Sequence, residues 1–279
     1  MLRKYGIFLL AITLVCIFSA CGQQEQAEEM EATEPVPEET KPAIVPGEMV
    51  FVPAGEFILG TDNKESFAYY PSRTTTLPAF WIDKYEITNL EFLDFTNESG
   101  YMGEDIQGKN WRLFFTSFDK ANDPAILTWN DAKAYCESKG KRLPSELEWE
   151  KAARGSEGFK YPWGNEWENG KSNTYESGLK APAAIGAYKG DVSPYGAYDM
   201  LGNVQEWTAS EYKPYKGNPK KDPNQIAGLK VARGLSYGYY GSKASLFERS
   251  AYLPSAIYNF GARCARDATP EEIASESNE

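Results

Sequence analysis

The sequence predicts one α+β domain, in which three short helices and several short strands are joined by long loops. The chain has 279 residues, 42% of them hydrophobic and 14% aromatic, which suits one large domain with short appendages. A helix-start motif occurs three times, and each copy is followed by a glycine that could end the helix. In addition, 24 Gly, 17 Pro and 18 Tyr indicate that loops and aromatic packing replace long regular elements.

Residues 1–20 have the pattern of a signal peptide. Arg3 and Lys4 form a positive n-region, and the apolar stretch 5–18 that follows is too short to span a bilayer. Removing those two cations would change the net charge from −11 to −13, since they are the only charged residues in the segment. We therefore expect an exported protein.

The end of this segment predicts a lipid anchor. Ser19 and Ala20 stand directly before Cys21, an arrangement that resembles a bacterial lipobox and implies cleavage before Cys21 and diacylglycerol on its sulfur. Phe18 occupies a position where leucine is more usual, so the alternative is a simple secretory cleavage after Ala20.

The composition then changes abruptly. Residues 21–46 are rich in Gln, Glu, Thr and Pro and offer little to bury, which predicts a disordered acidic tether between the anchor and a domain at 47–267. The acidic residues after Cys21 could alternatively form a surface-export signal. Residues 268–279 are again acidic, and we expect a frayed tail.

Short strands are expected in both halves of the domain. The apolar residues of segment 49–60 flank a Pro-Ala-Gly turn at 53–55, as in a β-hairpin. Residues 77–85 form a second strand-like run, and further short strands are expected near 230–240 and 261–265.

The three helix starts share one pattern, a hydroxyl residue three positions before a carboxylate. The hydroxyl can accept from an early backbone amide, while the carboxylate favours the positive end of the helix. The pairs are Thr88 with Glu91, Thr128 with Asp131, and Ser145 with Glu148. The predicted helices end at glycines suited to a left-handed cap, namely Gly100, Gly140 and Gly155.

Charge and composition exclude several classes of function. The net charge of −11 disfavours nucleic acid as a partner, because phosphate binding needs a basic face. The chain has no histidine, which excludes Ser-His-Asp catalysis and the histidine ligands of haem or facial-triad iron.

The segment 199–207, Asp-Met-Leu-Gly-Asn-Val-Gln-Glu-Trp, is the strongest candidate for a site. Asp199 and Glu206 are hard oxygen donors, and Gly202 lets the backbone fold back so that carbonyls can point at a shared cation. This pattern favours a calcium site. The alternative is an acidic turn in which Asp199 caps a short helix and Trp207 belongs to the core.

Seven motifs, in order, resemble the formylglycine-generating enzyme family, also called sulfatase-modifying factors. They lie at 51–57, 85–89, 129–132, 140–155, 161–164, 199–207 and 261–266. The resemblance implies a single α+β domain with little regular secondary structure, related to the C-type-lectin-like folds. It also implies an enzyme that oxidises a sulfatase cysteine to formylglycine, using oxygen and a copper ion held by two cysteines.

The resemblance carries over the metal site but not the catalytic pair. It implies calcium ligands at Asp199, Gly202, Val204 and Glu206, and a second site at Asn173 and Thr174 for which only Glu176 is a nearby acid. The two cysteine positions fall at Tyr239 and Ala244. A phenol and a methyl group cannot bind Cu(I) as a dithiolate, so no copper and no catalytic residues are expected.

Two cysteines remain in the predicted domain, Cys136 and Cys264. In an oxidising compartment a disulfide is favoured over two buried thiols, and the resemblance implies a bridge between these two positions. Closing such a loop would stabilise the fold by roughly 4 to 5 kcal/mol in the chain-entropy model.

Two functions of different class follow from these observations. The first is a lipid-anchored, calcium-stabilised, non-catalytic module of the bacterial cell envelope, which either binds an envelope protein, a peptide or a glycan or serves as a structural part of an envelope assembly. Its binding residues would be Ser236, Tyr237 and Tyr239, joined by Tyr240, Trp163 and Trp167, although for the two tryptophans a place in the core is favoured. The alternative is an oxidase that generates formylglycine.

Overall fold

A computed structural model describes residues 45, 47–64, 68–103, 120–218 and 226–276. All of these residues belong to one compact unit. The predicted signal peptide and Cys21 lie outside the described residues, as does all of the predicted tether except Val45. Among the residues that the structure describes, no helix is long and apolar enough to cross a membrane.

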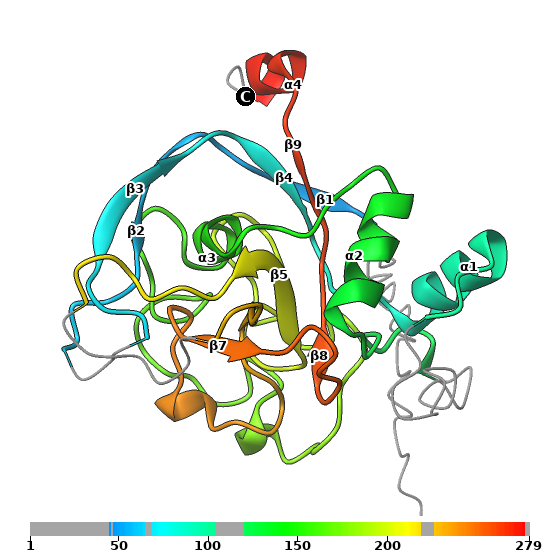
Figure 1. Cartoon of the computed structure of the whole chain (residues 1–279). Helices are drawn as coiled ribbons and strands as arrows, with labels where there is room; N and C mark the ends of the chain where they lie inside the picture. Colours follow the sequence, from blue (N-terminus) through cyan, green and yellow to red (C-terminus); the bar gives the residue numbers. More distant parts are fainter. Residues whose placement is uncertain (1–44, 46, 65–67, 104–119, 219–225, 277–279) are drawn as a thin grey trace, which may run out of the picture. The chain divides into compact units, whose positions relative to one another are not determined.

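The described residues combine short strands and short helices with long irregular segments, which confirms the predicted α+β class (Figure 1). One antiparallel sheet has the order β1 (Met49–Val52), β4 (Phe80–Asp83), β9 (Ala265–Asp267). A second is the pair β2 (Gly55–Leu59) and β3 (Arg73–Leu77).

A third sheet has the strand order β7-β6-β5-β8 and contains the end of the predicted metal motif. Its strands are β5 (Gln205–Glu211), β6 (Lys230–Arg233), β7 (Arg249–Tyr252) and β8 (Phe260–Gly261). Strand β8 runs parallel to β5 and places Phe260 opposite Gln205.

The hairpin predicted at 49–60 is wrong. Both strands form, but β1 pairs with β4 and β2 pairs with β3. Val50 lies opposite Ile82, and Phe57 lies opposite Thr75. The turn at 53–55 therefore separates two sheets instead of closing one, because each strand meets a better partner further along the chain.

All three predicted helices are present, and each begins with a complete capping box. They are α1 (Asn89–Ser99), α2 (Trp129–Ser138) and α3 (Glu146–Arg154), capped by Thr88, Thr128 and Ser145. Short 3-10 helices occur at η3 (Tyr175–Ser177) and η4 (Gly241–Lys243).

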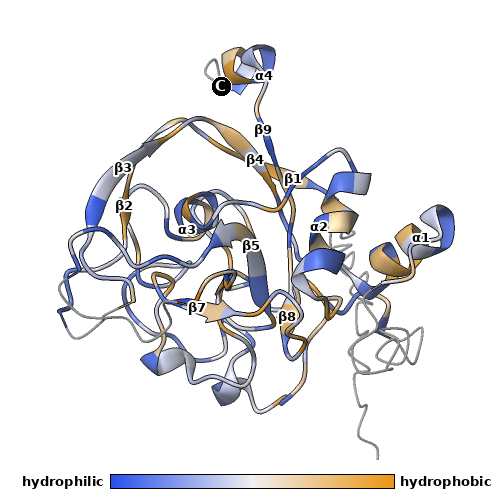
Figure 2. Cartoon of the chain, viewed as in Figure 1, coloured by the Kyte–Doolittle hydropathy of each residue, from blue (hydrophilic) through white to orange (hydrophobic). Residues whose placement is uncertain are grey.

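The core has two main hydrophobic clusters, one around Trp207 and one around Trp149, and both indoles are fully buried. Figure 2 shows apolar residues along β2 and β4, whereas α2 has an apolar and a polar side. The side of α2 that carries Ala132, Tyr135 and Cys136 is buried. The core thus forms where helices pack against the sheets, because each sheet is too short to form a core alone.

The acidic tail predicted at 268–279 is partly ordered, and its description as frayed is wrong for most of its length. Residues Pro270–Glu276 form helix α4. Thr269 and Glu272 exchange the two hydrogen bonds of a capping box, and the Glu272 carboxylate also binds both terminal nitrogens of Arg266 at 2.7 and 2.9 Å.

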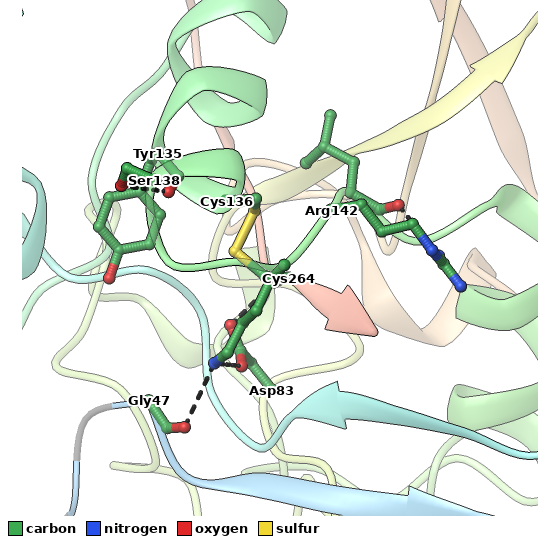
Figure 3. The surroundings of a disulfide bond; sticks show 9 residues. Gly47, Asp83, Tyr135, Cys136, Ser138, Arg142 and Cys264 are labelled. Carbon is green, nitrogen blue, oxygen red and sulfur yellow. Dashed lines mark hydrogen bonds and ion pairs between the residues drawn. A yellow bond between two sulfur atoms is a disulfide. The ribbon is translucent and has the colours of Figure 1, made fainter. Parts of the chain in front are cut away.

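The predicted disulfide is present between Cys136 of α2 and Cys264, directly before β9 (Figure 3). Both cysteines are fully buried. Beside the bridge, Asp83 accepts a hydrogen bond from the backbone N–H of Cys264 and one from the Lys141 ammonium at 2.6 Å. The bond joins positions separated by 128 residues and fixes α2 to the sheet of β1, β4 and β9.

Candidate functional site

The segment 199–207 is a tight turn that runs directly into a buried strand. Asp199, Gly202 and Asn203 have φ values of 57°, 85° and 50°. Such left-handed backbone is favourable for glycine and tolerated by Asp and Asn. The alternative in which Asp199 caps a helix is wrong, because β5 follows, whereas the placement of Trp207 in the core is confirmed.

The Glu206 carboxylate lies in a fully buried ion pair. Its two oxygens accept from Nη2 and Nε of Arg263, both at 2.7 Å, and one of them also accepts from the Trp149 indole N–H at 2.8 Å. Arg263 further donates to three backbone carbonyls, those of Asp83, Lys84 and Tyr198. The positive charge beside Glu206 is thus supplied by a side chain of the protein, that of Arg263.

Three more buried acidic side chains interact electrostatically with this pair. Glu86, Asp191 and Asp199 are at most 3% exposed. Burial raises the pKa of Glu86 and of Asp191 well above the usual value, and Asp199 raises both further. Burial also raises the pKa of Asp199 to about 6. One guanidinium therefore interacts with four acidic side chains, and burial favours the neutral form of three of them.

The oxygen atoms of this region fit a calcium ion in kind. Carboxylates and backbone carbonyls are the donors that calcium prefers. The Asp191 Oδ1 atom is buried without a hydrogen-bond partner in the described structure, which would be costly for an ionised oxygen that has no cation nearby. No three acidic, histidine or cysteine side chains of the described residues converge on one point, so an ion here would also need carbonyls such as those of Gly202 and Val204.

At the predicted second calcium site, the side chains already bind one another. The Asn173 amide donates to the Ala181 carbonyl and to Asn203, and its oxygen accepts from Ser177. Glu176 accepts from Thr174, from the backbone N–H groups of Gly241 and Ser242, and from the Ser242 hydroxyl. These hydrogen bonds hold the pKa of Glu176 down to about 2, against the opposing effect of burial.

Glu176 therefore fixes the segment that carries the two cysteine positions of the resemblance. Gly241 and Ser242 lie between Tyr239 and Ala244, and both donate to this one carboxylate. Tyr239 is 47% exposed, whereas Ala244 is 3% exposed. Among the described residues, the only sulfurs of cysteine belong to the Cys136–Cys264 disulfide.

A hollow of about 130 Å³ lies beside Tyr239. Two further tyrosines, Tyr252 and Tyr258, line it together with Phe260. The remaining lining residues are uncharged and polar, namely Gln205, Ser236 and Asn259. We refer to this hollow as the tyrosine pocket.

Of the predicted binding residues, Ser236 and Tyr239 line the tyrosine pocket. Tyr237 is not a lining residue, but its hydroxyl donates to the side chain of one, Asn259, at 3.0 Å. Tyr240 is exposed but packs against Tyr175, with ring centroids 4.4 Å apart and ring planes inclined by 46°. Trp163 and Trp167 are partly buried against the cluster around Trp149, where they pack with Tyr161.

The sequence reasoning missed Tyr252, Tyr258 and Asn259 in the tyrosine pocket, and Glu86 and Asp191 beside the metal motif. An available signal was the Tyr-Asn-Phe run at 258–260, directly before the motif at 261–266. For the two carboxylates no local signal exists, because Glu86 reaches Val204 and Asn203 across more than a hundred residues of sequence.

Comparison with known proteins identifies relatives over most of the chain. Residues 33–268 match the sulfatase-modifying factor enzyme 1-like domain. A bovine protein named formylglycine-generating enzyme is 32% identical over 81% of this chain and 76% of its own length. A mouse protein named inactive C-alpha-formylglycine-generating enzyme 2 is 31% identical over 79% of this chain and 86% of its own length.

Solved structures share the fold as well. PvdO from Pseudomonas aeruginosa superposes with a TM-score of 0.65 and 25% identity, covering 81% of this chain and all of PvdO. Treponema denticola variable protein 1 superposes with a TM-score of 0.62 at 19% identity, covering 79% of this chain and 95% of that protein, which shows the fold alone.

Proposed function

Since the chain belongs to the family of the sulfatase-modifying factor enzyme 1-like domains, whose members include both active and inactive proteins, we propose that it is a non-catalytic member that binds a peptide or glycan in the tyrosine pocket. One observation carries this proposal. Where the resemblance expects two catalytic cysteines, the chain has Tyr239 and Ala244, and Tyr239 forms part of the pocket wall.

The side chains at this place are unsuited to cysteine oxidation through copper. Cu(I) prefers soft sulfur ligands, and the seven residues that line the tyrosine pocket offer only hydroxyl, amide and aromatic groups. Exchange of a disulfide with a substrate cysteine needs a thiolate, which no residue of the pocket provides. The bridged cysteines serve the fold, because both are fully buried between α2 and β9.

The same side chains are suited to binding a small uncharged group. Tyrosine provides a large contact area with few rotatable bonds, and amides and hydroxyls give adaptable hydrogen bonds. The hollow of about 130 Å³ is well below the usual size of a pocket for a drug-sized molecule, which is roughly 300 Å³ or more. It therefore suits one side chain of a peptide or one ring of a glycan, with the rest of the ligand lying on the surface.

Calcium and a lipid anchor complete the proposal. Calcium would be held by Asp199 and Glu206 with the carbonyls of Gly202 and Val204, and it would balance part of the negative charge that Asp191 and its neighbours bury. Acylation of Cys21 would hold the domain at a membrane of the bacterial cell envelope. A protein, peptide or glycan of that envelope is then the partner.

The pocket can be tested by capture of partners from a solubilised bacterial envelope. The protein, a Tyr239→Ala variant and a Leu90→Ala control are immobilised in parallel, Leu90 being an exposed apolar residue of α1 that is not part of the pocket. We expect the protein and the control to capture the same peptide or glycan, and Tyr239→Ala to lose most of it. Equal capture by Tyr239→Ala would contradict the pocket as the binding surface.

A further inference from the structure

A second, more open hollow of about 400 Å³ lies at the start of β3, where it meets the loop that follows β5. Arg73, Lys213 and Lys216 line it, together with Pro214, Tyr215 and Glu146. None of these residues lines the tyrosine pocket. Three cations around one hollow are unusual on a chain whose net charge is −11.

The aromatic floor of this hollow positions its arginine. Tyr215 is only 5% exposed, and the Arg73 guanidinium carbon lies 5.0 Å from the centre of its ring. A second guanidinium, that of the buried Arg249, lies 4.5 Å from the same ring and 4.5 Å from that of Tyr212. Arg73 thus rests on a rigid, buried surface, which lowers the entropy that it would lose on binding a ligand.

The one carboxylate in the hollow is already neutralised. Glu146 accepts from Nε and Nη2 of Arg249 at 2.8 and 2.7 Å, and this pair is almost fully buried. Among the described residues, Arg73 and Lys216 have no ion pair, and Lys213 has only an exposed one with Glu211 at 3.6 Å. Within the described part of the chain, two of the three cations are therefore unpaired, and the third has only this exposed pair.

We propose that this hollow binds an oxyanion, the carboxylate, sulfate or phosphate group of a ligand, with Arg73 as its main partner. The planar guanidinium can donate two parallel hydrogen bonds to two oxygens of such a group, while Lys213 and Lys216 add point charges. Pro214 and the Tyr215 ring give an apolar wall against which the ring of a sugar acid or a sugar ester could pack. The ligand of this site is thus anionic, whereas that of the tyrosine pocket is uncharged.

The test is a titration of the ¹⁵N-labelled protein with sodium sulfate, sodium phosphate and sodium glucuronate at constant ionic strength. We expect saturable shifts of the backbone amides of residues 213, 215 and 216 with at least one anion, and the anion that binds most tightly identifies the kind of group. Arg73→Gln should weaken this binding about tenfold, the loss of roughly one charge-assisted contact. Lys133→Gln, which removes an exposed lysine of α2, should leave it unchanged.

Arg73→Lys distinguishes the contribution of the paired hydrogen bonds from that of the positive charge, since lysine keeps the charge but lacks the planar guanidinium. We expect its affinity to lie between those of the protein and Arg73→Gln. The absence of saturable shifts with all three anions would overturn the proposal, as would equal weakening by Arg73→Gln and Lys133→Gln. Neither result would bear on the tyrosine pocket, whose test uses other residues.

Discussion

Replacing Arg263 by Met tests whether the buried ion pair with Glu206 holds the centre of the fold. Both side chains are fully buried, so the change leaves the Glu206 carboxylate in the core without its cation. Removing one partner of such a pair typically costs about 3 to 5 kcal/mol. Three backbone carbonyls lose a donor as well, at about 1 kcal/mol each, so we expect a total near the upper end of that range or above it.

Glu206→Gln should lower the free energy of unfolding by less than Arg263→Met does, about 3 kcal/mol, for a structural reason. The amide oxygen of glutamine can still accept from the Trp149 indole, and Arg263 keeps its three carbonyl partners. A variant with Met at both 206 and 263 should be more stable than the sum of the two single changes predicts, because no buried charge is left without a partner.

Urea denaturation followed by tryptophan fluorescence measures these differences, with and without calcium. Trp149 and Trp207 are fully buried, so their emission reports on loss of the core. If both single variants lose less than about 1 kcal/mol, the value usual for an exposed pair, the reasoning about a buried central ion pair is refuted.

Three further predictions concern the bridge, the metal and a buried acid. Replacing Cys136 and Cys264 by Ala should lower the free energy of unfolding by about 5 kcal/mol, the chain-entropy value for a loop of this length. Denaturation without reductant measures this difference, and equal free energies for the protein and the variant would show that the bridge is dispensable. Calcium should raise the melting temperature of the protein but not that of Asp199→Ala, and an equal rise in both would argue against Asp199 as a ligand. Burial raises the pKa of Glu248 from 4.5 to about 7, so its neutral form favours the fold, and this contribution is lost as the pH rises from 4.5 to 7. Glu248→Gln should therefore stabilise the protein at pH 8 and change little at pH 4, whereas equal effects at both would contradict the shift.

The helices were predictable because their signals are local. The capping residues and the carboxylates they bind lie within four positions of sequence, as at Thr88 and Glu91. The same helix-start motif is present at Thr269 and Glu272 and could have predicted α4. The acidic composition of the tail instead favoured the prediction of a frayed segment. Strand pairing was not predictable in this way, since β1 pairs with β4, and the two strands between them in sequence, β2 and β3, form a separate sheet.

The candidate site shows the same division between local and distant information. The sequence indicated acidic donors at Asp199 and Glu206, and the structure places both in a buried region that is rich in acidic side chains. The sequence could not indicate that Arg263, 57 positions after Glu206, neutralises this carboxylate. The charges of Glu86 and Asp191 likewise meet the motif only in three dimensions, through the packing that buries them all.

The central claim is that this member of the family has no cysteine-oxidising chemistry at Tyr239 and Ala244. Its most direct test is to incubate the protein with copper, oxygen and a reduced sulfatase peptide that contains the target cysteine, beside the bovine formylglycine-generating enzyme as a positive control. Mass spectrometry and an aldehyde-reactive probe then measure formylglycine. We predict aldehyde in the control and none with this protein, and formation of formylglycine by this protein would contradict the account.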